Sequence, residues 1–190
     1  MTPRPELTFR RFDAAQARAI GDLVESLYLD AYATAIASGD EFDSVEQFMR
    51  RFEAYTSSGR GFDLVVAYTP GGEAVGQSWG WPLAPDTAWW GGLEAEPEPG
   101  FTAETGARTF ALSEIMVRRA WTGQGIAHRL HDQLLAARPE ARATLLVEAD
   151  NDRAYRAYRS WGWRQVGRLR PRWEHAPTFH VLILPLPIPS

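Results

Sequence analysis

The residue whose type and surroundings best suit it to chemistry is Glu114. It is the one acid in residues 110–117 (Phe-Ala-Leu-Ser-Glu-Ile-Met-Val), a run that is otherwise typical of a buried strand. Burial of a lone carboxyl would raise its pKa toward neutrality, where it can accept a proton from an attacking group. Glu148, in the next predicted strand, is a second candidate for this role, acting directly or through a water. A structural alternative stays open, in which Glu114 is paired with Arg108 or another buried arginine.

A glycine-rich bend follows the same run. Residues 118–127 read Arg-Arg-Ala-Trp-Thr-Gly-Gln-Gly-Ile-Ala, and apolar residues at helical spacing predict a helix over about 123–138. The first amides of a helix have no intrahelical acceptor and lie at the positive end of its dipole, so this order suits the binding of a diphosphate. Thr122 is a candidate N-cap. The alternative that the segment is a tight turn and binds no ligand stays open, because the segment lacks a P-loop lysine and the third glycine of a dinucleotide fingerprint.

A second motif lies further along the chain, in a helix predicted over 151–160. Ala154 follows Asn151 by three residues and Tyr158 follows it by seven, and this spacing places the three side chains on one helical face. The structural alternative is that Asn151 is only an N-cap and that Tyr158 is only a core aromatic residue.

Together these motifs resemble the GNAT N-acetyltransferase superfamily. Its acetyl-CoA signature, Gln/Arg-x-x-Gly-x-Gly/Ala after the fourth strand, is met by Thr122, Gly125 and Ala127, with threonine replacing the first residue. Its later pattern, Asn-x-x-Ala-x-x-x-Tyr-x-x-x-Gly-aromatic, is matched over residues 151–163. The resemblance covers about residues 110–165.

The resemblance implies a role for each part of the two motifs. Tyr158 would protonate the departing thiolate, Asn151 would hold the pantetheine arm, and a backbone N–H of residue 116 or 117 would stabilise the oxyanion. The phosphates of the coenzyme would also meet Arg118, Arg119 and Arg129. The main-chain groups expected to bind acetyl-CoA are those of Ile115, Met116 and Val117 for the pantetheine, and of Gly123, Gln124, Gly125, Ile126, Ala127 and His128 for the diphosphate.

The resemblance also implies an activity. An acetyl group would move from acetyl-CoA to a primary amine by direct attack in a ternary complex. We expect a small cationic acceptor, because residues 1–117 hold 18 acids against 8 arginines and many aromatic residues. The residues expected to line its site are Asp30, Tyr32, Asp40, Glu41, Trp79, Trp81, Trp89 and Trp90. Two alternatives stay open: the acidic segment is only a solvated loop, or the protein is a non-catalytic acyl-CoA sensor. The sequence does not determine the acceptor, the length of the acyl group or the oligomeric state, for which a homodimer is one option.

The elements that must position these residues form a single α/β domain over residues 1–190. Strands are predicted at 7–12, 62–69, 73–83, 109–117, 143–148, 163–169 and 179–184, with helices at 14–32, 44 to about 58, 123–138 and 151–160. The order is therefore β-α-α-β-β-β-α-β-α-β-β. Together with the resemblance, it indicates a GNAT-like fold: a central mixed, mostly antiparallel sheet of about seven strands with about four helices.

Composition excludes several other functions. The chain has no cysteine and no lysine, which rules out a catalytic thiol and Schiff-base chemistry. Its net charge of −4 argues against nucleic acid, and no apolar run is long enough for a membrane span, so a cytoplasmic location without membrane partner is expected. No metal is expected, because the four histidines lack the HExxH spacing. Ser78 lies in a Gly-x-Ser-x-Gly match, but an alternating strand surrounds it instead of the strand–turn–helix of a hydrolase.

Overall fold

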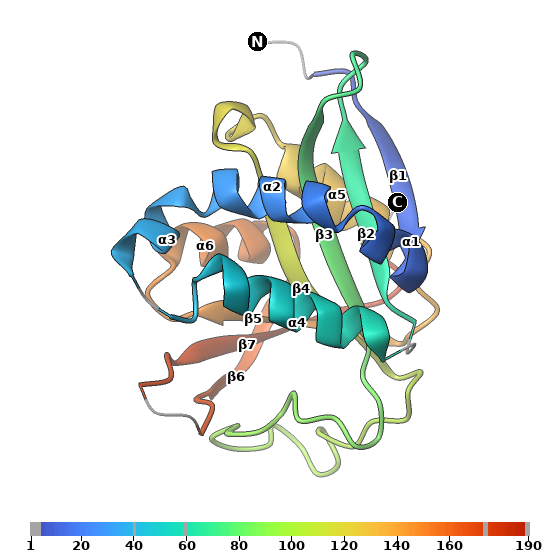
Figure 1. Ribbon diagram of the computed structural model, residues 1–190. Helices are drawn as coiled ribbons and strands as arrows, with labels where there is room; N and C mark the ends of the chain where they lie inside the picture. Colours follow the sequence, from blue (N-terminus) through green and yellow to red (C-terminus); the bar gives the residue numbers. More distant parts are fainter. Residues whose placement is uncertain (1–4, 40, 59–60, 173–174, 189–190) are drawn as a thin grey trace. The chain divides into compact units, whose positions relative to one another are not determined.

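The computed structural model describes residues 5–39, 41–58, 61–172 and 175–188 (Figure 1). Seven strands hydrogen-bond in the order β1-β2-β3-β4-β5-β7-β6. The strands are β1 (Thr8–Asp13), β2 (Asp63–Tyr68), β3 (Ala74–Pro82), β4 (Thr109–Val117), β5 (Arg142–Glu148), β6 (Arg164–Leu169) and β7 (Phe179–Pro185). The helices are α1 (Ala14–Ala19), α2 (Gly21–Ala31), α3 (Ala33–Ser38), α4 (Val45–Ser57), α5 (Ile126–Leu135) and α6 (Asp152–Ser160), with a short 3-10 turn, η1, at Arg119–Trp121.

The predicted sheet is confirmed. β4 pairs with β5 in parallel, whereas the pairs β1–β2, β2–β3, β5–β7 and β6–β7 are antiparallel. About four helices were expected, whereas the described residues form six, and the fold class is the one predicted. The single helix expected over 14–32 is interrupted at Ile20, whose backbone leaves the helical region (φ −112°, ψ 27°) just before Gly21, and α3 follows as a further helix. Glycine is a poor helix former, which favours a break at this point.

The chain divides into two compact units. The first contains Met1–Trp81 and Glu114–Ala136, and the second contains Pro82–Ser113 and Ala137–Ser190. Strand β4 therefore passes from the second unit into the first after Ser113. The residues predicted to do chemistry divide in the same way, since Glu114 and the glycine-rich bend belong to the first unit, and Asn151 and Tyr158 to the second.

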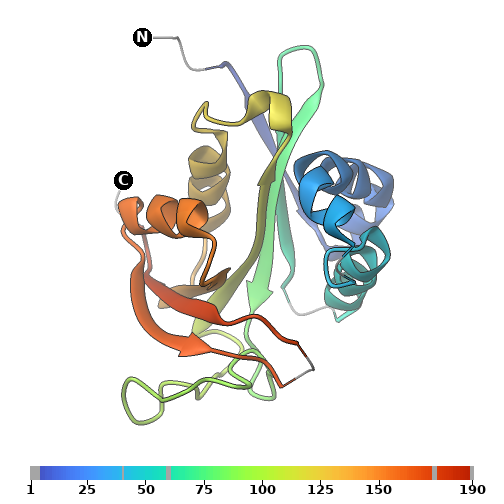
Figure 2. The same ribbon diagram turned by 90° about the vertical axis from the view of Figure 1, so that its left-hand side faces the viewer.

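In the first unit, helices cover both faces of β1–β3. Helices α1–α4 lie on one face and α5 lies on the other (Figure 2). Strand β2, Asp-Leu-Val-Val-Ala-Tyr, is buried at five successive positions because both of its faces are covered. Trp79 of β3 is 1% exposed at the centre of the α4 side, where its ring lies 5.4–6.2 Å from those of Phe48, Phe52, Phe62, Tyr55 and Trp81.

In the second unit, the long segment 83–108 is anchored to the strands by buried groups. Glu104 Oε1 accepts hydrogen bonds from Trp90 Nε1 (3.1 Å), Thr109 Oγ1 (2.8 Å) and Arg142 Nη2 (3.1 Å). Residues 94–100 are all exposed. Just before them, Arg170 N donates to Gly92 O (3.0 Å) and Glu94 N to Arg168 O (3.0 Å), which covers the edge of β6.

These elements bear on two expectations from the sequence, one about a serine hydrolase and one about a membrane span. Ser78 lies inside β3 and is fully buried, so it is not the exposed serine of a hydrolase elbow. Among the described residues, no helix combines the length and the apolar character that a bilayer crossing demands.

Candidate active site

Glu114 lies in the part of β4 that belongs to the first unit, on a strand that is apolar around it. It keeps part of its surface accessible, but protein atoms crowd the carboxyl. Burial raises the pKa of Glu114 from its ordinary value of 4.5 to about 7, the Arg51 guanidinium lowers it, and the Asp43 carboxylate adds to the rise. The expected environment of Glu114 is therefore confirmed: its carboxyl can change protonation state near neutral pH.

Aromatic side chains from α2, α4 and β3 form the surroundings of this carboxyl. The charge of Glu114 contributes to raising the pKa of Tyr28, to about 12, and of Tyr55, with burial as the main cause in both. The Tyr28 hydroxyl donates to the backbone oxygen of Asp43 (2.9 Å), and Tyr55 stacks on Trp81 with 3.9 Å between ring centroids. Both phenols are thus protonated at neutral pH, next to a carboxyl that is able to ionise.

The proposed partner of Glu114 in the structural alternative, Arg108, has other acceptors. Its Nη1 donates to the carbonyl oxygens of Gly100 (2.9 Å), Phe101 (3.2 Å) and Ala103 (2.6 Å). The arginine that acts on Glu114 is Arg51, whose Nη1 donates to Phe42 O (3.1 Å) and whose guanidinium lies 4.2 Å above the Phe42 ring.

Sequence reasoning missed Arg51, Asp43 and Tyr55. A signal was available for two of them, because Arg51 and Tyr55 are four residues apart in a predicted helix and so share a face. Nothing in the sequence linked that face to the strand of Glu114, which follows almost 60 residues later.

The glycine-rich bend has the backbone that the sequence predicted, but a different cap. Gly123 (φ 77°) and Gly125 (φ 76°) are in the left-handed region, which other residues adopt at a cost. Gly125 is the N-cap of α5 and makes no side-chain capping bond. The expectation that Thr122 caps the helix was wrong, because its hydroxyl donates to Arg119 O (3.0 Å).

The first turn of α5 therefore has amides without an intrahelical acceptor. The first bond of the helix runs from Arg129 N to Gly125 O (3.2 Å), which leaves the N–H groups of residues 126–128 outside the intrahelical pattern. Gly123, Gln124 and Gly125 are exposed. This end of the helix can accept an anion from solvent.

The three arginines expected at the coenzyme phosphates are engaged with the protein. Arg118 donates to Ala74 O (2.8 Å) and Ser26 Oγ (3.0 Å), and Arg129 donates to Pro5 O (2.8 Å). Arg119 uses its backbone N–H to bind Asp30 Oδ2 (2.7 Å). The Arg119 guanidinium is 3.8 Å from Asp30 Oδ1 and its side chain is 62% exposed, so it and the main-chain groups keep the role that the sequence assigned to this region.

The other strand residues expected to bind acetyl-CoA are on β4. Ile115 and Val117 are half-buried, and Met116 is 3% exposed in the core under α2. The pairs between β4 and β5 run from Thr109 to Ala111 on β4, and the strand continues for six residues beyond them.

In the second unit, Asn151 has the capping role of the structural alternative, whereas Tyr158 is not a buried core residue. Asn151 Oδ1 accepts from Ala154 N (3.1 Å) as the N-cap of α6. The Tyr158 ring packs edge-on against Trp161 (5.3 Å) and Trp163 (6.2 Å) and is half-buried. Glu148, the second candidate base, ends β5 opposite Phe179.

The site expected for a cationic acceptor is only partly supported. Trp79 and Trp90 were wrongly expected to line it, because Trp79 is in the aromatic core of the first unit and Trp90 is 7% exposed and bonded to Glu104. Four of the remaining residues contact other residues of the first unit: Asp30 accepts from Arg119 N, Glu41 accepts from Gln47, Tyr32 stacks on Tyr28 (4.7 Å) and Trp81 stacks on Tyr55. Trp89 belongs to the second unit. Asp40 lies outside the described residues.

Comparisons with known proteins identify similar sequences and similar structures. A family model described as an acetyltransferase (GNAT) domain matches residues 95–172. A search of curated proteins gave no match.

Solved structures share the fold over nearly the full length. A protein assigned to the GNAT acetyltransferase family from Desulfovibrio desulfuricans is 12% identical, with 96% of this chain and 100% of that chain covered and a TM-score of 0.67. The yncA protein of Salmonella typhimurium, solved with its cofactor acetyl-CoA, is 15% identical, with 97% and 96% covered and a TM-score of 0.57. The spermidine/spermine N-acetyltransferase SpeG of Vibrio cholerae is 13% identical, with 95% of each chain covered and a TM-score of 0.59. The match over residues 95–172 and the shared fold make this chain similar to acetyltransferases of the GNAT family.

Proposed function

We propose that this protein transfers the acetyl group of acetyl-CoA directly to a primary amine, with Glu114 as the general base. The observation that carries the proposal is the carboxyl of Glu114, whose pKa is raised to about 7 in a strand adjoining a glycine-rich helix start. A base that titrates near the working pH is the most efficient proton acceptor. Strongly perturbed pKa values cluster at functional sites, which favours a role of Glu114 in the reaction.

The chemistry follows from the protonation states. An alkylammonium has a pKa near 10, so the acceptor arrives charged and must lose a proton before its nitrogen can attack the thioester carbon. The Glu114 carboxylate, directly or through a water, takes that proton. The nitrogen–carbon bond then forms, the carbonyl oxygen becomes an oxyanion stabilised by a backbone N–H of Met116 or Val117, and the carbon–sulfur bond breaks as the thiolate leaves. Tyr158 gives its hydroxyl proton to the sulfur, and the second proton, which the nitrogen loses as the amide forms, returns to the Tyr158 oxygen.

The main chain would hold the coenzyme. The uncapped amides of Gly123, Gln124, Gly125, Ile126, Ala127 and His128 suit a diphosphate, since amides at a helix start carry partial positive charge. Main-chain groups of residues 115–117 would bind the pantetheine as an added strand does, with the side-chain amide of Asn151 as a further donor. The acetyl-CoA complex of yncA, which shares the fold, supports this proposal.

The acceptor is proposed to be a small cationic metabolite. The acidic excess of residues 1–117 would attract a cation, and Tyr28, Tyr55 and Trp81 offer aromatic faces near Glu114. SpeG, which shares the fold, acts on spermidine and spermine. A cytoplasmic location and a single domain over residues 1–190 remain part of this proposal.

The direct test measures thiol release from acetyl-CoA across a panel of amines. We expect calorimetry to detect acetyl-CoA binding that weakens as salt is raised, and at least one cationic amine to give thiol release. Binding without thiol release from any amine would favour the acyl-CoA sensor. Absence of both heat and thermal shift with acetyl-CoA would reject the proposal, and preference for neutral or anionic amines would reject the cationic acceptor.

The pH profile of the reaction gives a separate prediction. The pKa of Glu114 is raised to about 7, so below that pH the carboxyl is protonated and cannot accept a proton. We expect kcat/KM to rise with pH through about 7, measured as initial rates with saturating acetyl-CoA. The rise near pH 7 should vanish in Glu114→Gln, whereas a step unchanged in that variant would contradict the assignment.

Replacing Tyr158 by phenylalanine tests the proton donor. The ring and its contacts with Trp161 and Trp163 are kept, so the fold should not change, while loss of the hydroxyl should lower kcat by about 10²-fold. The matched control is Tyr155→Phe on the same helix, which removes a hydroxyl bonded to Gln165 Oε1 (2.9 Å). Equal steady-state rates in wild type and Tyr158→Phe would remove Tyr158 from the mechanism or show that thiolate departure does not limit the rate. A pre-steady-state measurement of thiol release in the presence of the amine, which observes the chemical step alone, separates the two.

A further inference from the structure

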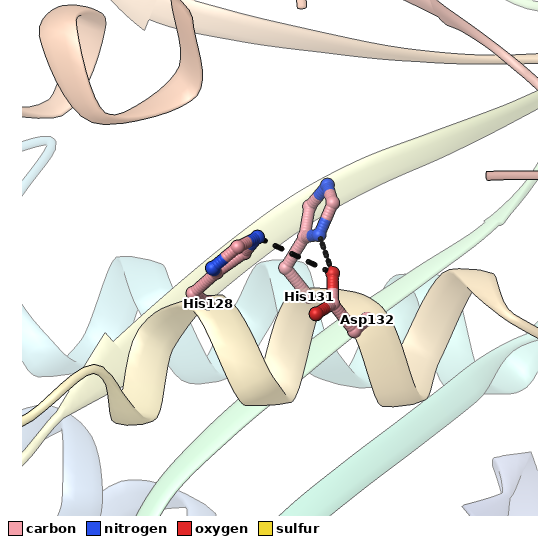
Figure 3. A group of neighbouring side chains, drawn as sticks. All are labelled: His128, His131 and Asp132. Carbon is pink, nitrogen blue, oxygen red and sulfur yellow. Dashed lines mark hydrogen bonds and ion pairs between the residues drawn. The ribbon is translucent and has the colours of Figure 1, made fainter. Parts of the chain in front are cut away.

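Three side chains that can bind a metal ion gather on helix α5. His128, His131 and Asp132 are at positions i, i+3 and i+4, so the helix places them side by side. His131 Nδ1 lies 2.8 Å and His128 Nε2 lies 3.5 Å from the same atom, Oδ1 of Asp132 (Figure 3). One ligand atom from each of the three lies within 4.8 Å of the others.

These separations resemble those of atoms that share one metal ion. Imidazole nitrogen and carboxylate oxygen bind Zn²⁺ at about 2.0–2.2 Å, so two ligands of a tetrahedral ion are roughly 3.4 Å apart. Both imidazoles already direct a nitrogen toward one carboxylate oxygen (Figure 3). Small side-chain rotations would suffice to admit an ion.

Burial and exposure are divided among the three in a way that suits a metal ligand set. The His131 side chain is 2% exposed, so the surrounding protein fixes the position of one imidazole. The His128 and Asp132 side chains are 48% and 47% exposed, which leaves the cluster open to ions from solvent.

We propose that His128, His131 and Asp132 form a zinc site with its fourth position open to solvent. Two imidazoles and one carboxylate suit Zn²⁺, whereas Mg²⁺ and Ca²⁺ prefer oxygen ligands. The ion would join the first turn of α5 to the second and so hold the start of the helix. The sequence carries this signal as His-x-x-His-Asp in a predicted helix, a spacing that differs from HExxH.

The test uses chelator-treated full-length protein without acetyl-CoA, so its result is independent of the proposed reaction. Titration with ZnCl₂ by calorimetry should give one site per chain, and His128→Ala should raise its Kd by at least about tenfold. Because His128 is half-exposed, this variant should fold. Asp132→Asn, which keeps the shape of the side chain, should weaken binding in the same way.

A matched control separates this site from general histidine binding. His175 is exposed and has a positive φ (58°), so His175→Asn suits the backbone and should leave the Kd for Zn²⁺ unchanged. Co²⁺ in place of Zn²⁺ should give the visible absorption of a four-coordinate ion, lost in His128→Ala. Absence of binding, or binding that is the same in wild type and His128→Ala, would overturn the proposal.

Discussion

Replacing Glu114 by glutamine is expected to lower kcat by about 10²–10⁴-fold, the contribution typical of a positioned general base. The amide has nearly the same shape as the carboxyl but cannot take a proton from the acceptor. Binding of acetyl-CoA should change little, because its proposed contacts are main-chain groups and Asn151. Steady-state kinetics with saturating acetyl-CoA, together with calorimetry on both proteins, make the measurement.

The stability of the same variant shows whether lost activity is lost folding. Because the pKa of Glu114 is higher in the folded chain (about 7) than its ordinary value of 4.5, the stability that this group contributes is present below pH 4.5 and is lost as pH rises through about 7. Glu114→Gln removes this loss, so above pH 7 it should be at least as stable as wild type. Glu53→Gln, an exposed acid on α4, is the control for both measurements. Turnover near that of wild type in Glu114→Gln would reject Glu114 as the base.

Replacing Glu104 by alanine is expected to lower the free energy of unfolding by about 3–5 kcal/mol. The side chain of Glu104 is fully buried and that of Arg142 is 12% exposed, so the change leaves a largely buried guanidinium without its carboxylate. It also removes the acceptor of the Trp90 and Thr109 donors, although Arg142 keeps its bond to Phe101 O (2.7 Å). Denaturant unfolding of the two proteins gives the difference.

Glu98→Ala is the matched control for this variant. Glu98 is an acid of the same segment but is exposed, so its removal should change the free energy of unfolding by less than about 0.5 kcal/mol. Similar losses from both variants would show that the segment depends on its overall charge and not on the buried contacts of Glu104.

The strands were predicted well from the sequence because their signals are local. β4 was predicted with its observed bounds, since its apolar run is uninterrupted except by Ser113 and Glu114. Local signals also mark two helix starts: Asp13 and Ser44 are residue types that favour N-caps, and both side chains accept the capping backbone bond. The helix break at Ile20 was not predicted. The apolar residues keep their helical spacing across it, and a change in the backbone angles of one residue leaves no pattern in the sequence.

The candidate site was predicted less completely, for a physical reason. The raised pKa of Glu114 followed from its apolar neighbours in the strand, but the roles of Arg51 and Asp43 depend on how α4 packs, which a local pattern does not contain. Trp79 and Trp90 were assigned to a binding surface because tryptophan suits both a core and a ligand. The same ambiguity affected Arg118, whose charge suggested a phosphate while its bonds go to Ala74 and Ser26.

The anchoring of segment 83–108 has a practical consequence. The buried bonds of Glu104 and the bridge to β6 hold it on either side of residues 94–100, which contribute no buried side chain. Extra residues added there would lengthen a loop whose closure entropy grows only slowly with length. This stretch is therefore the place where an epitope or a fluorescent reporter can be inserted into the protein without loss of the contacts that stabilise the fold.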